Sequence, residues 1–171
     1  MKPILTPTAA EVVRCVRETI ESVLKPALQG RSEFSYATSA THLLAFVERR
    51  LEDEGQILLD EVNYLRGLFP DALSWLATQP HTSALCAAIT ESLQFKRDAD
   101  IYPSLRLMSE QLGPLRQHVC DLLLLLQAAE NNGRSAAGDE LHSSLRRYIA
   151  WQLEREGTIV EPAFRGRGPR R

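Results

Sequence analysis

Apolar side chains recur every three or four positions through most of the 171-residue chain, with polar residues between them. This spacing predicts amphipathic helices. The first is expected over about residues 8–28, because Thr8-Ala-Ala-Glu11 has the form of a capping box, while Pro26 and Gly30 mark an end. Its apolar residues are expected to form one buried stripe, made of Val12, Val13, Val16, Ile20, Val23, Leu24 and Leu28.

A second apolar pattern runs from Ser32 to about Leu65, and predicts one long helix or two helices joined near Gly55. A glycine inside a helix costs only about 1 kcal/mol relative to alanine, so both alternatives stay open. Gly67 and Pro70 then predict a break, followed by a separate short helical turn.

Three more helices are predicted, over about residues 82–98, 103–130 and 139–156. The middle one is apolar nearly all the way round from Val119 to Leu126, as expected of a helix surrounded by others. No segment alternates with the period of two that marks a half-buried strand. The predicted fold class is therefore all-α, a bundle of about five main helices with no significant β-sheet. The last helix is expected to bury Leu141, Leu145, Tyr148, Ile149 and Leu153.

Composition supports one globular domain, since 44% of the residues are apolar and 25% are charged. Residues 1–160 are expected to form a single helical-bundle domain. Residues 161–171 combine arginine with glycine and proline, and are predicted to be a disordered tail. Four of the arginines lie in that tail, so the rest of the chain is clearly acidic, which makes nucleic acid an improbable partner.

A soluble, cytoplasmic protein is expected. The longest apolar run, Leu122 to Leu126, is far shorter than the roughly 20 residues that cross a bilayer. The first residues lack the apolar core of a signal peptide. The three cysteines are widely separated and show no metal-binding spacing, so we expect buried, unreactive thiols.

Motifs for catalysis are missing from the sequence. It contains no Gly-x-Ser-x-Gly nucleophile turn, no glycine-rich phosphate loop and no Glu-x-x-His pair of the kind that binds metals in helical bundles. No catalytic residue, metal or cofactor is predicted. The charged run from Glu48 to Glu54 is interpreted as a solvated face, with attractive pairs Arg49–Asp53 and Arg50–Glu54.

Two polar clusters are the candidates for ligand binding. His118 and Asp121 are three residues apart and share a helix face, although neighbouring polar residues favour a solvated stripe there. Asp98, Asp100 and Tyr102 gather just before a proline, where a helix end followed by a proline-initiated helix explains them without a ligand.

Several segments of the first hundred residues also follow a known pattern: Thr8–Glu11, Val16–Ile20, Leu24–Leu28, Gly30-Arg31 and Leu44–Glu52. On the basis of these segments, residues 8 to about 103 resemble a family of uncharacterised bacterial all-helical proteins. Members are typically encoded beside aminoglycoside-phosphotransferase-like kinases and acyl-CoA dehydrogenases. The resemblance implies an auxiliary role in a catabolic pathway and brings no catalytic residue with it.

The sequence therefore favours a non-enzymatic accessory or interaction protein, with an acyl-CoA dehydrogenase or a phosphotransferase-like enzyme as the partner that the resemblance implies. Apolar helix faces joined by short loops also favour a homodimer or another helical partner. The alternative is a small-molecule-binding bundle or an enzyme with a pocket between helices, using His118, Asp121 or the cluster of Asp98, Asp100 and Tyr102.

Overall fold

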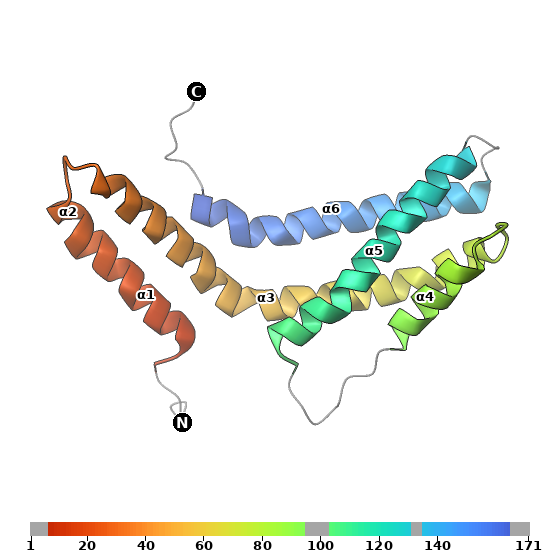
Figure 1. Ribbon diagram of the computed structural model, residues 1–171, viewed down its shortest axis with the longest axis horizontal. Helices are drawn as coiled ribbons and strands as arrows, with labels where there is room; N and C mark the ends of the chain where they lie inside the picture. Colours follow the sequence, from red (N-terminus) through yellow and green to blue (C-terminus); the bar gives the residue numbers. More distant parts are fainter. Residues whose placement is uncertain (1–6, 95–102, 131–134, 165–171) are drawn as a thin grey trace. The chain divides into compact units, whose positions relative to one another are not determined.

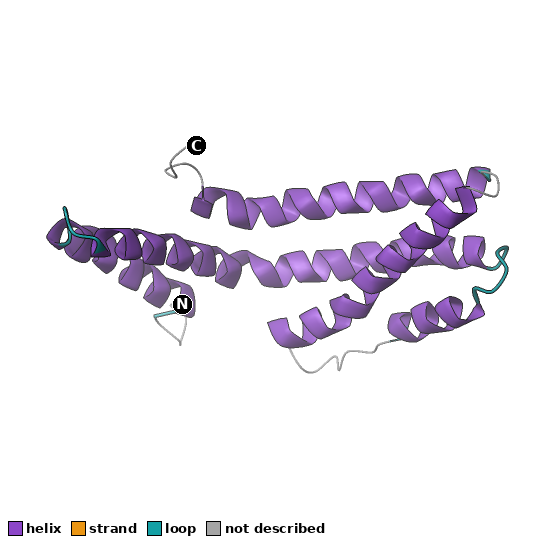
Figure 2. Cartoon of the chain, turned by 45° about the horizontal axis from the view of Figure 1, so that its top comes forward, coloured by secondary structure: helices purple, strands orange, loops and turns teal. Residues whose placement is uncertain are grey.

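The computed structural model describes residues 7–94, 103–130 and 135–164. Every regular element in these ranges is a helix and none is a strand (Figure 2). The all-α prediction is confirmed. In chain order the elements are α1 (Ala9–Thr19), the π-helical segment η1 (Ile20–Leu24), α2 (Lys25–Ala27), α3 (Glu33–Leu76), α4 (Ser83–Leu93), α5 (Leu105–Glu130) and α6 (Ala136–Phe164).

The first helix begins at the predicted capping box. The Thr8 hydroxyl accepts a hydrogen bond from the Glu11 amide at 3.2 Å, and the Glu11 carboxylate accepts one from the Thr8 amide at 2.7 Å. The helical path then continues through η1 and α2 without a gap. It ends before Gly30, whose φ of 81° is the left-handed conformation that glycine adopts at helix ends.

Helix α3 runs unbroken for 44 residues, through Gly55, Gly67 and Pro70. The predicted break at Gly67 and Pro70 is wrong. Proline inside a helix removes one backbone hydrogen bond, but Phe69 and Ala72 on either side of Pro70 are fully buried. Packing of this stretch holds the helix together, while Pro70 itself lies on the exposed side.

The chain divides into two compact units. Unit 1 comprises residues 1–55 and 155–171, and unit 2 comprises residues 56–154. The single domain over residues 1–160 stays a prediction. Helix α6 extends to Phe164, further than the sequence indicated, and residues 165–171 of the predicted tail lie outside the described residues.

Unit 2 contains the main hydrophobic core, formed by the second half of α3 with α4, α5 and most of α6 (Figure 1). Helix α5 contributes a stripe at helical spacing that includes Leu115, Val119 and Leu122. Leu141, Leu145 and Tyr148 of α6 are buried, as predicted. The prediction for Leu153 is wrong, because it lies well round the helix from Tyr148 and is 64% exposed.

Unit 1 contains α1, η1, α2 and the first half of α3, which run side by side in opposite directions (Figure 1). The buried stripe predicted for the first helix is wrong, since no residue of α1 or η1 is buried. Arg14 and Arg17 make the polar contact of α1 with α3, while Val12 and Val16 are exposed and Val13 and Ile20 are only half-buried.

The cysteines also differ from expectation. Cys15 and Cys120 are exposed and Cys86 is half-buried, so the prediction of buried thiols is wrong. Cys86 packs against the edge of the core of unit 2, which accounts for its partial burial. No helix in the described part of the chain combines the length and apolarity needed to span a membrane.

Candidate functional site

A buried carboxylate joins three helices of unit 2. Glu61 on α3 has no exposed surface, and it accepts hydrogen bonds from Arg116 on α5 and from Tyr148 on α6. Arg116 donates through Nε to Oε1 and through Nη2 to Oε2, both at 2.7 Å. The Tyr148 hydroxyl donates to Oε1 at 2.6 Å. Donors from two other helices, α5 and α6, therefore compensate the buried negative charge of Glu61.

The surroundings keep Tyr148 a neutral donor. Burial raises the pKa of Tyr148 far above its ordinary value, and the adjacent Glu61 carboxylate raises it further. A protonated hydroxyl is therefore available to the carboxylate at any physiological pH. With its oxygens bonded on both sides, Glu61 is suited to fixing the register of α3, α5 and α6 rather than to reacting.

His118, a residue that the sequence analysis selected, lies on the inner face of α5. It is 7% exposed, and its Nε2 lies 2.9 Å from the hydroxyl of Ser92 on α4. Burial lowers the pKa of His118, outweighing the Asp121 carboxylate and the Ala88 backbone, which act to raise it. The solvated-stripe interpretation is thus wrong for His118, which occupies a place in the α4–α5 contact.

Asp121, the predicted companion of His118, lies at the edge of the same contact. Its Oδ2 is 4.0 Å from His118 Nδ1, and its Oδ1 accepts a hydrogen bond from Gln117. The two residues are therefore brought near each other, but only His118 is buried. Asp98, Asp100 and Tyr102, the second predicted cluster, lie outside the described residues.

A groove of about 520 Å³ opens between α4 and α5 in unit 2. Gln111 lies in its wall and is only 5% exposed, yet neither its Oε1 nor its Nε2 has a hydrogen-bond partner. His118 Nδ1 is likewise buried without a hydrogen bond. The described residues that line the groove are Glu91, Ser92, Gln94, Glu110, Gln111 and Pro114.

Sequence reasoning missed Gln111 and Glu61, although a signal was present for both. Gln111 precedes Leu115 by four residues, and Glu61 precedes Leu65 by four, so each polar residue lies on an apolar stripe. A polar residue at such a position predicts a buried polar contact.

Unit 1 contains a second polar cluster, on the contact between α1 and α3. Glu48 of α3 is buried, and its two carboxylate oxygens accept hydrogen bonds from Arg14 and Arg17 of α1. Arg14 also reaches Glu52, at 3.0 Å. Burial alone would raise the pKa of Glu48, but the hydrogen bonds and charges of the two arginines outweigh it and the pKa is lowered. The predicted solvated face is wrong at Glu48.

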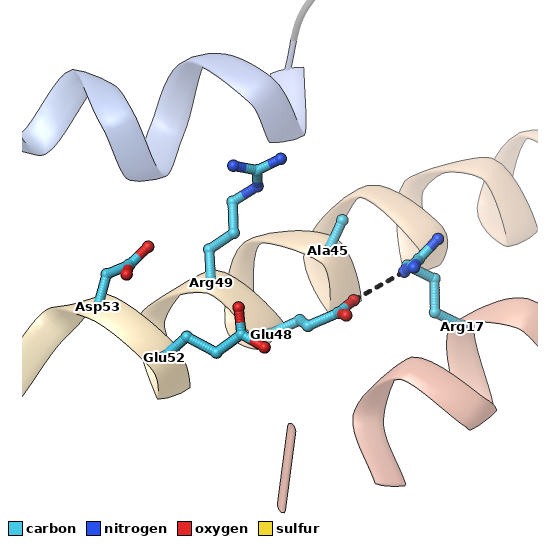
Figure 3. A pocket seen from close by; sticks show the side chains of 6 residues that line it. All are labelled: Arg17, Ala45, Glu48, Arg49, Glu52 and Asp53. Carbon is cyan, nitrogen blue, oxygen red and sulfur yellow. Dashed lines mark hydrogen bonds and ion pairs between the residues drawn. The ribbon is translucent and has the colours of Figure 1, made fainter. Parts of the chain in front are cut away.

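A cavity of about 400 Å³ lies beside this cluster and is lined by Arg17, Ala45, Glu48, Arg49, Glu52 and Asp53 (Figure 3). Arg49 extends away from Glu48 there. The predicted pair Arg50–Glu54 forms. No hydrogen bond or ion pair joins Arg49 to Asp53 in the structure as described.

Metal binding gains no support from these clusters, because no three His, Cys, Asp or Glu residues within the described ranges are placed to hold an ion. No protein-family model, curated protein or solved structure matches the chain.

Proposed function

We propose that this protein is a non-enzymatic interaction protein, in which unit 1 pairs through exposed apolar stripes with unit 1 of a second copy of the chain. The observation that carries the proposal is the outward position of the apolar side chains in this unit. Among the described residues, the two buried carboxylates are Glu48 and Glu61, and both are occupied in joining helices.

The first stripe lies on α1 and η1. Val12, Val16 and Val23 follow one another at helical spacing on one face, and they are 46%, 46% and 59% exposed. Arg14 and Arg17 lie on another face and make the contact with α3. This exposed stripe therefore lies on a different side of the helix from the arginines that contact α3.

The second stripe lies on the first half of α3, where Tyr36, Leu43, Val47 and Leu51 are all exposed. At 100° per residue, these four side chains fall within one narrow strip along the helix. Their spacing of seven, four and four residues keeps them on one side of an α-helix, as expected of a face that packs against another helix. Glu48, which binds the arginines of α1, lies on a different side of α3.

A second copy is the simplest partner for these stripes. An isologous dimer uses the same patch on both subunits. The apolar stripes of one copy would therefore pack against the equally long apolar stripes of the other copy. Burial of apolar surface contributes about 25 cal/mol per Å², and this term drives the association. The resemblance of residues 8–103 supports an auxiliary role for the dimer, beside an acyl-CoA dehydrogenase or a phosphotransferase-like enzyme.

Light scattering coupled to size-exclusion chromatography tests the proposal. The full chain should elute with the mass of a dimer, and the double variant L43Q/L51Q should elute as a monomer. L124Q is the matched control, because Leu124 is an exposed leucine of α5, in unit 2. Its mass should equal that of the unchanged chain.

Circular dichroism of each variant checks that the helices persist. A monomeric mass for the unchanged chain across the accessible concentrations would contradict the proposal. Equal loss of the dimer in L124Q and in L43Q/L51Q would contradict the assignment to the two stripes.

A further inference from the structure

The segment of α1, η1 and α2 lacks the buried apolar side chains that anchor other helices. None of its residues is buried, and Val13 and Ile20 are only half-buried. In unit 2, by contrast, α4, α5 and α6 each bury apolar residues completely, among them Ile89, Leu115 and Leu145. Segments with few buried apolar contacts open locally at a lower free energy than the rest of a protein. We therefore expect this segment to separate from α3 more readily than the helices of unit 2 separate from one another.

The contact that joins the segment to α3 depends on one carboxylate. Arg14 Nε donates a hydrogen bond to Glu48 Oε1, and Arg17 Nε donates one to Glu48 Oε2 at 3.0 Å. We call these two hydrogen bonds the Glu48 contact. The Glu48 side chain is only 11% exposed, so water and salt screen the contact weakly. Loss of this carboxylate would leave, within the described ranges, the exposed pair of Arg14 and Glu52 as the ion pair between α1 and α3.

The same contact fixes which way the apolar stripes of unit 1 face. Along α1, Arg17 follows Val16 by about 100° of rotation, and along α3, Glu48 follows Val47 by about 100°. The rotation has the same sense in both helices, and the two helices run in opposite directions (Figure 1). Val16 and Val47 therefore lie on the same side of the helix pair. The two stripes form one apolar face while the Glu48 contact is closed, and they separate if the segment moves away from α3.

We propose that the Glu48 contact controls the association with a second copy of the chain. The segment opens from α3 as a unit when this contact breaks, and only the closed form presents both stripes to a partner. The inference rests on the association proposed above and adds its regulation. When a binding-competent form is only partly populated, the apparent dissociation constant rises by the reciprocal of its fraction. Both chains of a dimer must be closed, so opening weakens the association through each of them.

Hydrogen exchange, read by mass spectrometry of peptides from residues 9–27, measures the opening. Glu48→Ala removes both acceptors and keeps a good helix former in α3. The comparison uses the full chain with L43Q/L51Q, which should be monomeric, so that dissociation does not contribute. Amides of residues 9–27 should exchange about tenfold faster or more after Glu48→Ala, because two hydrogen bonds to a charged group are lost. Peptides from α5 should exchange at unchanged rates, as expected if unit 2 stays folded.

Glu21→Ala is the matched control. Glu21 pairs with Arg17 at 3.5 Å and with Lys25 at 3.8 Å, but both pairs stay within the segment, and the Glu21 side chain is 55% exposed. Exchange of residues 9–27 should change by less than about threefold. Light scattering over a dilution series, without L43Q/L51Q, then measures association. The dissociation constant of the dimer should rise about tenfold or more with Glu48→Ala and stay within about threefold with Glu21→Ala.

The outcomes distinguish the regulation from the association itself. Equal exchange of residues 9–27 with and without Glu48→Ala would overturn the inference. Faster exchange combined with an unchanged dissociation constant would overturn it too, although the dimer would stand. A monomeric mass for the unchanged chain would contradict the proposed association and, with it, the regulatory role, whatever the exchange rates are.

Discussion

Arg116 holds both oxygens of the Glu61 carboxylate in a two-pronged contact, at 2.7 Å for each hydrogen bond. The carboxylate has almost no contact with solvent, whereas the arginine side chain is 40% exposed. The cation therefore enters from the surface and compensates a charge that lies inside. Tyr148 completes the contact from a third helix, so one buried acid links α3, α5 and α6.

Replacing the arginine should be strongly destabilising. Arg116→Met removes both hydrogen bonds from the arginine, so the buried Glu61 carboxylate keeps only the hydrogen bond from the Tyr148 hydroxyl. Breaking a buried pair from one side costs about 3–5 kcal/mol, and the partial exposure of Arg116 puts the expected loss at the lower end. Urea unfolding followed by circular dichroism measures the difference.

Arg106→Met is the control for this variant. Arg106 pairs with Glu110 at 2.7 Å on the same helix, but both side chains are exposed. Exposed pairs contribute about 0.2–1 kcal/mol, so the change should be small. Similar losses in the free energy of unfolding for both variants would show that the buried contact stabilises the protein no more than an exposed pair does.

Tyr148→Phe isolates the third hydrogen bond of the same cluster. It keeps the ring among its aromatic neighbours Tyr64 and Trp151 and removes only the hydroxyl. A hydrogen bond to a charged group contributes about 1.5–3 kcal/mol, and a loss in that range is expected. An unchanged midpoint in urea would contradict the role of Tyr148 as a donor to Glu61.

The sequence predicted the helices well, because their apolar spacing is a local property. The first helix starts at the capping box of Thr8, and the start of α4 agrees with the prediction to within a residue. The break at Pro70 failed for a non-local reason. Whether a helix tolerates proline depends on how much packing surrounds it, and Phe69 and Ala72 pack against segments distant in the sequence.

The polar sites were harder to predict, since periodicity shows which residues share a face but not what that face meets. Val12 and Val16 share an apolar stripe with correct spacing, yet the stripe faces outward. The α3 contact instead uses Arg14 and Arg17, whose partner Glu48 is more than thirty residues away. The sequence indicated His118 through its spacing to Asp121, but its burial depends on residues distant in the sequence, among them Ser92 and Phe69.

Two glycines should respond in opposite ways to alanine. Gly67 lies inside α3 with open space where a Cβ would stand, so Gly67→Ala should stabilise the protein by about 0.5–1 kcal/mol. Gly30 also has open space, but its φ of 81° strains any other residue. Gly30→Ala should destabilise by about 1 kcal/mol. Thermal unfolding of the two variants compares them, and a shift of equal sign in both would contradict the argument.

The buried, unpartnered amide of Gln111 should make the protein less stable than it would be with an apolar side chain at this position. Gln111→Met keeps the length of the side chain and removes the two polar atoms that lack partners. A gain of about 1–2 kcal/mol in the free energy of unfolding is expected, because the desolvation penalty disappears. Gln117→Met, at an exposed position, should change stability by less than about 0.5 kcal/mol. A loss of stability in Gln111→Met would indicate that the amide has a partner within the fold.

Acidification should destabilise unit 2 through His118. Burial lowers the pKa of His118 in the folded protein, while the unfolded chain has the ordinary value of about 6.5. The unfolded state therefore binds a proton more readily, and stability falls as the pH decreases from about 6.5 towards the lower folded-state pKa. Above that window the neutral imidazole contributes fully. Below it both states are protonated and no further loss occurs.

Urea unfolding at about pH 7.5 and about pH 5.5 measures this effect, because the histidine of the unfolded chain takes up its proton mainly between these two values. The unchanged chain should be less stable at the lower pH, and His118→Gln should show a smaller difference because its amide does not titrate. The lowered pKa of Glu48 acts in a separate range, below about 4.5, since carboxylates there begin to take up protons. An equal pH dependence in His118→Gln and the unchanged chain would assign the effect to other groups, and the burial of His118 beside Ser92 would then have no consequence for proton binding.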